Sequence, residues 1–288
     1  MELFQYPYMQ RALIAALVIG LAAPALGIYL VQRRLTLIGD GIGHVALTGV
    51  GAGLLLNRSP VLVAVIVATA GAIAIELVRA RGRTSGDLAL ALLFYGGIAG
   101  GVLLVGLSDA TSANLNSYLF GSLTTISAAD LTTIAVLGAA ILVTMIALRP
   151  ALFAVSHDEE YARVSGLPVR TLNLLIAVTT AVTVTIAMRA VGVLLISALM
   201  VVPVATAQQV TRGFRSTMTA AMALGLFAAG TGVWVAATAD TAPGASVVLM
   251  AIASFLVVAV AGGIWRALRR RATPASVSPA EPHEVVLH

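Results

Sequence analysis

Long apolar stretches recur along this 288-residue chain, with short polar segments between them. About 20 apolar residues are enough for an α-helix to cross the hydrocarbon core of a bilayer. A helix also satisfies its own backbone hydrogen bonds in lipid, where water is absent. The pattern therefore predicts an all-α, polytopic transmembrane bundle of about nine spans, with eight as the alternative. The predicted spans are 9–31, 36–56, 60–80, 87–107, 130–148, 171–189, 191–208, 217–238 and 245–267.

The segments outside these spans have their own patterns. Residues 108–129 begin with polar residues and predict an irregular or short helical piece at one surface. Residues 1–270 are interpreted as one transmembrane domain. Residues 271–288 are rich in Pro, Ala and Ser, which predicts a disordered tail. We expect the two histidines of this tail to be solvated rather than bound to metal.

Composition agrees with a membrane protein and excludes several chemistries. Hydrophobic residues make up 59% of the chain and charged residues only 10%, with a mean hydropathy of +1.01. The absence of cysteine excludes disulfides, thiolate metal sites and thiol redox chemistry. The chain has no lysine and no Walker A sequence, so we do not expect it to hydrolyse nucleotide itself.

All 17 basic residues are arginines, and their positions predict an orientation. When nine spans alternate, five arginine clusters fall on one side of the membrane. The positive-inside rule makes that side cytoplasmic, with the N-terminus outside and the C-terminus inside. Merging 171–208 into a single span would break this agreement. The five clusters lie at 33–34, 79–83, 149–170, 212–215 and 266–271.

The second predicted span carries two ionisable residues, Asp40 and His44. Residues four apart lie on one helix face, and an ionisable group near the bilayer centre costs about 2.5–3.5 kcal/mol on insertion scales. An oxygen and a nitrogen ligand together suit Zn, Mn or Fe as divalent ions. The alternative is that Asp40 caps the helix and His44 bonds a neighbouring carbonyl. The residues alone favour neither interpretation.

The most highly charged segment between spans runs from 149 to 173. Ser156 is predicted to cap a short helix that ends before Gly166, with Pro168 as a stop. A short capped helix of this kind is typical of a docking element for a partner. The alternative, a solvated connector, is less attractive because such connectors are usually only a few residues long. Acidic residues suit the first turn of this helix: Asp158, Glu159 and Glu160.

The span 191–208 contains two residues that interrupt helices, Gly192 near its start and Pro203 late in its course. Proline removes a helical hydrogen bond and kinks the span. Interrupted helices line pathways in transporters, although ordinary kinks are also common in membrane helices.

These features occur in a known order, and the chain resembles the permease subunits of ABC importers for zinc, manganese or iron(II). The resemblance covers most of the chain up to about residue 267. The matching stretches are RRLTLIGDGIGHVALTGVGAG, SGDLALALLFYGG, NSYLFGSL, HDEEYARVSGLP, VGVLLISALMVVPVATA and TAPGASVVL.

The resemblance implies a fold like that of the cobalamin and siderophore importers, called type II ABC importers. It implies a homodimer in the bacterial plasma membrane, two copies of a cytoplasmic ATPase and an extracytoplasmic metal-binding protein. Asp40 and His44 match the residues that contact the ion. The stretch 157–168 matches the coupling helix, with Asp158, Glu159, Glu160, Ala162 and Gly166 as its docking residues. Thr48 stands where the family often has proline, which predicts a straighter second span.

The resulting hypothesis is a permease subunit of an ATP-driven importer of divalent zinc, manganese or iron. It is not an enzyme, holds no permanent cofactor and has no nucleic-acid partner. One alternative is a proton-coupled secondary carrier, in which Asp40 and His44 would relay protons. A second is an ABC permease for chelated metal or cobalamin, which would need a wider pathway. A non-transporting scaffold would leave the two ionisable residues unexplained.

Overall fold

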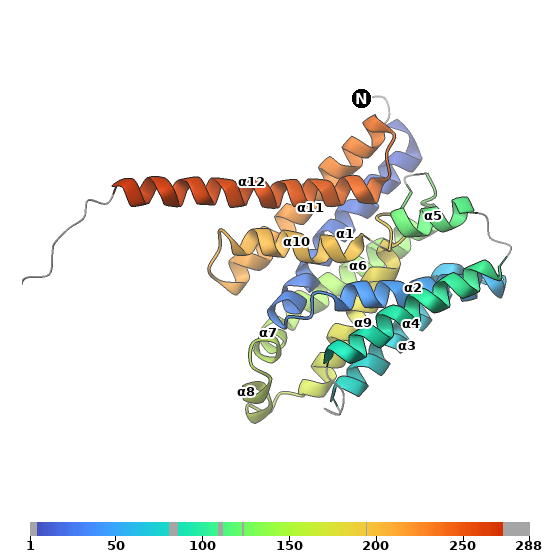
Figure 1. Cartoon of the computed structure of the whole chain (residues 1–288), viewed down its shortest axis with the longest axis horizontal. Helices are drawn as coiled ribbons and strands as arrows, with labels where there is room; N and C mark the ends of the chain where they lie inside the picture. Colours follow the sequence, from blue (N-terminus) through green and yellow to red (C-terminus); the bar gives the residue numbers. More distant parts are fainter. Residues whose placement is uncertain (1–4, 81–85, 109–111, 123, 194, 273–288) are drawn as a thin grey trace, which may run out of the picture.

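The structure is a computed structural model that describes residues 5–80, 86–108, 112–122, 124–193 and 195–272. These residues form twelve helices and no strand (Figure 1). The helices are α1 (Pro7–Gln32), α2 (Ile38–Leu55), α3 (Pro60–Ala80), α4 (Gly86–Gly106), α5 (Ser112–Phe120), α6 (Ala128–Ala147), α7 (Arg149–His157), α8 (Glu159–Val164), α9 (Val169–Ala187), α10 (Ile196–Gln208), α11 (Phe214–Ala239) and α12 (Pro243–Ala272).

Within the described ranges, seven helices are long and apolar enough to cross a membrane. They coincide with seven of the nine predicted spans, and the short helix α5 lies in the segment predicted as irregular or briefly helical. The other two predicted spans contain shorter apolar helices, Leu90–Gly106 within α4 and Ile196–Gln208. The all-α, polytopic fold is therefore confirmed, whereas the count of nine spans is not. Residues 273–288 of the predicted tail lie outside the described residues.

The predicted span 191–208 is wrong in its first turns. α9 ends at Ala187, and the chain follows a turning path before α10 begins at Ile196. Gly192 has a φ of +93°, a conformation that is open to glycine but strained for other residues. This break shortens α10 to 13 residues, with Pro203 inside it.

Local sequence explains where several helices begin. Three helices begin with a proline: α1 at Pro7, α3 at Pro60 and α12 at Pro243. Proline lacks a backbone N–H, and the first N–H of a helix has no acceptor within the helix, so no hydrogen bond is lost there. At α6, the Ser127 hydroxyl accepts a hydrogen bond from the backbone N–H of Asp130, at 3.1 Å. The Asp130 carboxylate accepts one from the backbone N–H of Ser127, at 3.0 Å, which completes a capping box.

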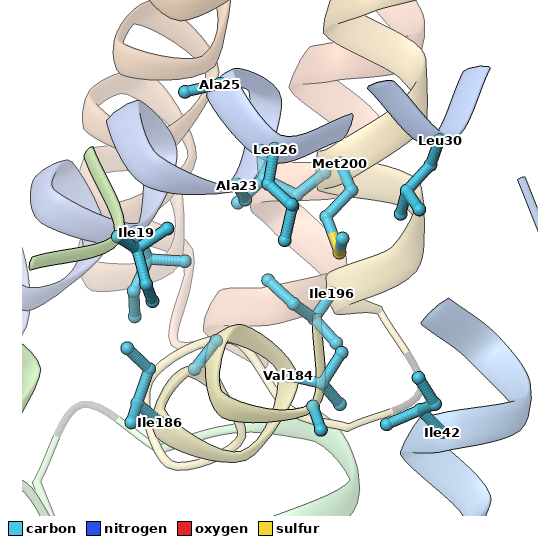
Figure 2. Packing of buried hydrophobic residues seen from close by; sticks show 14 of the residues in the cluster. Ile19, Ala23, Ala25, Leu26, Leu30, Ile42, Val184, Ile186, Ile196 and Met200 are labelled. Carbon is cyan, nitrogen blue, oxygen red and sulfur yellow. The ribbon is translucent and has the colours of Figure 1, made fainter. Parts of the chain in front are cut away.

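The core surrounds α1, which packs against α6, α9, α10 and α11. Figure 2 shows Leu26 of α1 near Ile196 and Met200 of α10, with Val184 of α9 and Ile42 of α2 in the same cluster. On the other side of α9, α2 packs against both α3 and α4 (Figure 1). The apolar stripes of these helices therefore form one continuous interior that holds α2 and its two ionisable residues in place.

The outward faces of several helices are apolar as well. Leu92 of α4, Val143 of α6 and Val257 of α12 are each about two-thirds exposed. Apolar faces of this extent would be unfavourable in water but suit the hydrocarbon of a bilayer or another membrane-embedded subunit.

Candidate functional site

Asp40 and His44 lie one turn apart on a partly exposed face of α2, and Thr48 continues that face by one more turn. The other side of α2 is buried and rich in glycine, which lets neighbouring helices approach closely. The packing of α2 therefore buries its apolar side and leaves the two ionisable side chains only partly covered.

Asp40 does not cap the helix. The N-cap residue of α2 is Leu37, and no side chain accepts a hydrogen bond from the first turn. Asp40 is the third residue of α2, where the helix dipole favours a carboxylate by about 0.3–1 kcal/mol. The position tolerates an acid without using it as a cap, so the capping alternative loses its main support.

The ring of His44 lies edge-on to Phe94 of α4, with 4.4 Å between centroids and 72° between planes. Its Nδ1 atom is buried and has no hydrogen-bond partner. The alternative in which His44 bonds a neighbouring carbonyl is therefore not observed for this nitrogen. An unpaired buried polar atom costs about 1–3 kcal/mol, so a buried ring nitrogen without a partner makes His44 a candidate functional residue.

α4 approaches α2 most closely beside His44. A Cβ atom built on Gly97 would lie 2.6 Å from the backbone nitrogen of Val45 and 3.0 Å from Cβ of His44. Thr48 spans the same interface, because its hydroxyl donates to the carbonyl oxygen of Gly97 at 2.8 Å. Thr48 thus links two helices at the position where the family often has proline, and α2 runs unbroken from Ile38 to Leu55.

An open, mostly apolar hollow of about 330 Å³ lies between the residue before α2 and the first half of α4, and neither Asp40 nor His44 is among its lining residues. Among the described residues, no group of three or more His, Cys, Asp or Glu side chains is placed to hold a metal ion. Asp40 and His44 therefore supply at most part of a coordination shell, since zinc takes four ligands and manganese commonly six. The hollow is lined by Leu37, Leu90, Ala91, Phe94 and Tyr95.

The segment predicted to dock a partner forms two short helices, α7 and α8. The prediction that Ser156 caps the second one is wrong, since Ser156 is a buried residue in the last turn of α7. The cap is Asp158, whose carboxylate accepts a hydrogen bond from the backbone N–H of Tyr161 at 2.9 Å. Asp158 has the extended backbone that a cap requires (φ −147°, ψ 103°), whereas Ser156 is still helical.

The predicted end of α8 at Gly166 is confirmed. Gly166 has a φ of +80°, and its N–H donates to the carbonyl of Arg163 at 3.1 Å. The N–H of Leu167 donates to the carbonyl of Ala162, also at 3.1 Å. These two bonds form a Schellman motif, which needs a left-handed residue at this position.

The side chains of α8 divide into an inner and an outer set. Ala162 is fully buried, and Glu159 pairs with Arg33 of the α1 end at 3.6 Å. Tyr161 and Val164 point outward and are 67% and 88% exposed. A short helix that leaves a tyrosine and a valine this exposed presents an apolar surface to something outside the chain.

Arginines from four of the five predicted clusters meet at one end of the bundle, which we call the arginine-rich end. A polar cavity there joins the end of α3 to α8 and the start of α9, and a second hollow joins His157 of α7 to the loop before α11. The side-chain nitrogen Nε2 of Gln32, at the end of α1, lies 3.3 Å from Nδ1 of His157. The cavities and ion pairs of this end contain Arg33, Arg79, Arg163, Arg170 and Arg212.

Gly192 belongs to a glycine junction at the other end, formed by Gly121, Gly192 and Gly244. A Cβ on Gly192 would lie 2.4 Å from the carbonyl oxygen of Leu119, and one on Gly244 would lie 1.7 Å from that of Val191. Three chain segments therefore touch through their backbones. Sequence reasoning singled out Gly192 only. The other two glycines stand in NSYLFGSL and TAPGASVVL, but nothing local indicates that these stretches meet.

An ion pair next to this junction was also missed. Arg189 donates to the carboxylate of Asp130, at the start of α6, and lies over the ring of Tyr118. Burial is the largest single influence and lowers the pKa of Arg189, but the hydrogen bond that Arg189 donates to Asp130, the charge of Asp130 and the contact with Tyr118 together raise that pKa above its usual value. Only the assignment of both residues to one side of the membrane could have suggested this pair.

Comparison with known proteins places these features in a family. The model of the ABC 3 transport family matches residues 5–262. The manganese transport system membrane protein MntC of Halalkalibacterium halodurans is 30% identical over 254 residues, covering 88% of this chain and 87% of MntC. The high-affinity zinc uptake system membrane protein ZnuB of Haemophilus influenzae is 31% identical over 238 residues, covering 83% of this chain and 91% of ZnuB.

Solved structures agree. A chain of PsaBC from Streptococcus pneumoniae, solved in complex with Fab, matches with a TM-score of 0.80 and 29% identity, covering 88% of this chain and 92% of that one. An inward-facing structure of a metal-chelate type ABC transporter matches with a TM-score of 0.72 over 87% and 85% of the two chains. Its 16% identity supports the fold alone. The chain belongs to the ABC 3 transport family.

Proposed function

We propose that this chain is the membrane-spanning permease subunit of an ATP-driven importer of divalent transition-metal ions. The observation that carries the proposal is the Asp40–His44 pair, two potential ligands on one face of a membrane helix, neither serving as a cap. Family membership supplies the transporter class. The relatives MntC and ZnuB are named for manganese and zinc respectively, so the cargo is assigned as a class of ion.

In this proposal, a carboxylate oxygen of Asp40 and a ring nitrogen of His44 contact the passing ion. The ion's remaining ligands come from water, backbone carbonyls, another helix or the same pair in a second copy of the chain. An incomplete shell suits transport, because a site that binds too tightly does not release its ion. The ring of Phe94 excludes water on one side of His44 and orients the imidazole.

The arginine-rich end is proposed to face the cytoplasm, in accordance with the positive-inside rule. α8 would then be the coupling helix that meets a separate ATPase, which hydrolyses ATP on behalf of the permease. The residues predicted to dock the ATPase are Asp158, Glu159, Glu160, Ala162 and Gly166. Asp158 and Gly166 shape the ends of α8, and Ala162 packs inward, so the direct contacts fall to Glu160, Tyr161 and Val164.

The partners follow from the same proposal. Two copies of the permease would form the pathway, two copies of the ATPase would drive it, and an extracytoplasmic metal-binding protein would deliver the ion. The glycine junction lies at the end that would receive that protein. The complex would sit in the bacterial plasma membrane, with the C-terminus of the chain in the cytoplasm.

The test is metal-stimulated ATPase activity of the reconstituted complex with zinc, manganese and iron(II), for the wild type and for Asp40→Ala and His44→Ala. We expect both substitutions to abolish stimulation and uptake while the complex still assembles. Gly96→Ala on the neighbouring helix α4 is the control, since a Cβ there meets no atom within 4 Å and removes no potential ligand. Near-normal uptake by both alanine variants would disprove the site. Uptake that follows a proton gradient without ATP would instead favour a secondary carrier.

A further inference from the structure

The polar cavity that joins α3, α8 and α9 at the arginine-rich end plays no part in the proposed ion pathway. It has a volume of about 600 Å³ and opens between the last turn of α3, α8 and the first turns of α9. This volume lies within the usual range for small-molecule sites, about 300–1,000 Å³. Its polar lining consists of Glu76, Arg79, Glu159, Arg163, Arg170 and Asn173.

The charges around the cavity do not balance. Among the residues that the structure describes, three arginines and two glutamates line it, which gives a net charge of +1, and Arg33 behind Glu159 raises this to +2. Burial, and next the nearby guanidinium of Arg79, lower the pKa of Arg33, although an arginine stays protonated at neutral pH. Positive charge is therefore concentrated here beyond what the two carboxylates neutralise.

The existing ion pairs leave one guanidinium free. Arg79 makes two hydrogen bonds to Glu76, at 2.9 and 3.0 Å, and thereby occupies both carboxylate oxygens. Glu159 is shared between Arg163 at 3.2 Å and Arg33 at 3.6 Å. Among the residues that the structure describes, Arg170 has no ion-pair partner within 4.0 Å, although it lines the same cavity.

Two further groups point to an anionic ligand. α9 begins at the cavity with Val169 and Arg170. The N–H of Val169 donates to the carbonyl of Leu167 at 2.8 Å, and the N-cap residue, Pro168, has no side chain to bond the next N–H groups of the first turn. One turn further on, Asn173 lines the cavity, is 95% buried, and has an amide oxygen without a partner. The amide of Asn173 also carries an N–H₂ group, which can donate a hydrogen bond to a ligand in the cavity.

We propose that this cavity binds a phosphate group, carried by an anionic phospholipid headgroup or present as free phosphate. Guanidinium groups and a helix N-terminus are the donors that proteins use for phosphate. A basic pocket between membrane helices on the proposed cytoplasmic side is also where anionic headgroups are bound. A divalent cation would be repelled by the surplus arginines. The bound phosphate would bridge α9 to α8 through Arg170 and Arg163, so it would also steady the helix proposed to meet the ATPase.

The experiment uses the purified permease–ATPase complex, depleted of lipid in detergent. Thermal unfolding is measured during titration with phosphatidylglycerol, with phosphatidylcholine and with inorganic phosphate, and native mass spectrometry counts the bound lipids. Arg170→Gln removes the free guanidinium, Arg170→Lys keeps its charge, and Arg215→Gln removes an exposed arginine that does not line the cavity. We expect Arg170→Gln to weaken binding about tenfold or more, as for the loss of a charge-assisted hydrogen bond.

Selective stabilisation by phosphatidylglycerol identifies a lipid site, and stabilisation by inorganic phosphate identifies a free-anion site. Either result supports the proposal if Arg170→Gln weakens it, Arg170→Lys retains part of it and Arg215→Gln leaves it unchanged. Equal responses of Arg170→Gln and the wild type would overturn it. So would a loss of ATPase co-purification in Arg170→Gln without a change in phosphate or lipid binding, because the cavity would then be a docking surface. The experiment rests on the proposed ATPase partner, but none of its readouts depends on metal transport, so the proposed ion site can fail or stand separately.

Discussion

Replacing Gly97 by alanine would test whether the close contact of α4 with α2 positions His44. The new Cβ atom would lie 2.6 Å from the backbone nitrogen of Val45 and 2.7 Å from the carbonyl carbon of His44. Ordinary contact begins at 3.4 Å, and backbone atoms cannot rotate away as a side chain can. The difference between 3.4 and 2.6 Å means that α4 and α2 must separate by about 0.8 Å, since a close-packed interior has little free space.

The separation has two costs. Overpacking of a well-packed interface costs about 1–3 kcal/mol. The hydroxyl of Thr48 and the carbonyl of Gly97, now 2.8 Å apart, would move beyond hydrogen-bond distance. The loss of an interhelical hydrogen bond in a membrane adds about 0.6 kcal/mol. The total of about 2–4 kcal/mol is smaller than the 5–15 kcal/mol typical of a folded protein. We therefore expect Gly97→Ala to fold with a displaced α4.

The neighbouring Gly96 provides a matched control, because a Cβ there meets no atom within 4 Å. Thermal unfolding of the purified complex and uptake of zinc, manganese and iron(II) by cells would be compared for the two alanine variants. We expect Gly96→Ala to match the wild type, and Gly97→Ala to unfold at a lower temperature and lose most uptake. If Gly97→Ala matched Gly96→Ala in both measurements, the argument that α4 positions His44 would be refuted.

Three further substitutions test other parts of the fold. Gly166→Ala should strain the left-handed end of α8 by about 1–2 kcal/mol, without any clash, and reduce ATPase co-purification more than Gly166→Asn does. Tyr29→Phe removes the buried 2.8 Å hydrogen bond to the carbonyl of Met145, so we expect a loss of about 0.5–1.5 kcal/mol, and an unchanged melting temperature would contradict this. Arg189→Gln should cost at most about 1 kcal/mol because its pair with Asp130 is partly exposed, and the cost should shrink in high salt.

The success and failure of sequence reasoning at α7 and α8 have a common physical origin. Ser and Asp are both good caps, so composition alone could not choose between Ser156 and Asp158. The choice depends on how far α7 extends, and that depends on the burial of Leu152 and Val155 against other helices. Gly166 was identified correctly because its left-handed conformation is a local requirement.

The break before α10 shows the opposite limit. Apart from Arg189, the sequence between α9 and α10 is as apolar as these helices, so the apolar pattern continues although the described residues 188–193 and 195 are not helical. The cause is tertiary, because the backbone N–H of Val193 donates to the carbonyl of Tyr118, and Ser122 donates to the carbonyl of Arg189. Contacts between segments about 70 residues apart leave no periodic signal. The same applies to the pairing of Thr48 with Gly97, which depends on the packing of α4.

The position of α8 determines how a movement of the proposed ATPase partner could reach the proposed ion site. The ion pair between Glu159 and Arg33 joins α8 to the end of α1, but at 3.6 Å with a glutamate 41% exposed it contributes at most about 1 kcal/mol. Packing is the stronger connection, since Ala162 is fully buried and α7 contacts α1, α6 and α9. A push on Tyr161 and Val164 would therefore move α7, α8 and the end of α1 together. α2 begins at Ile38, five residues after Arg33, so that movement reaches the first turn of α2, where Asp40 lies.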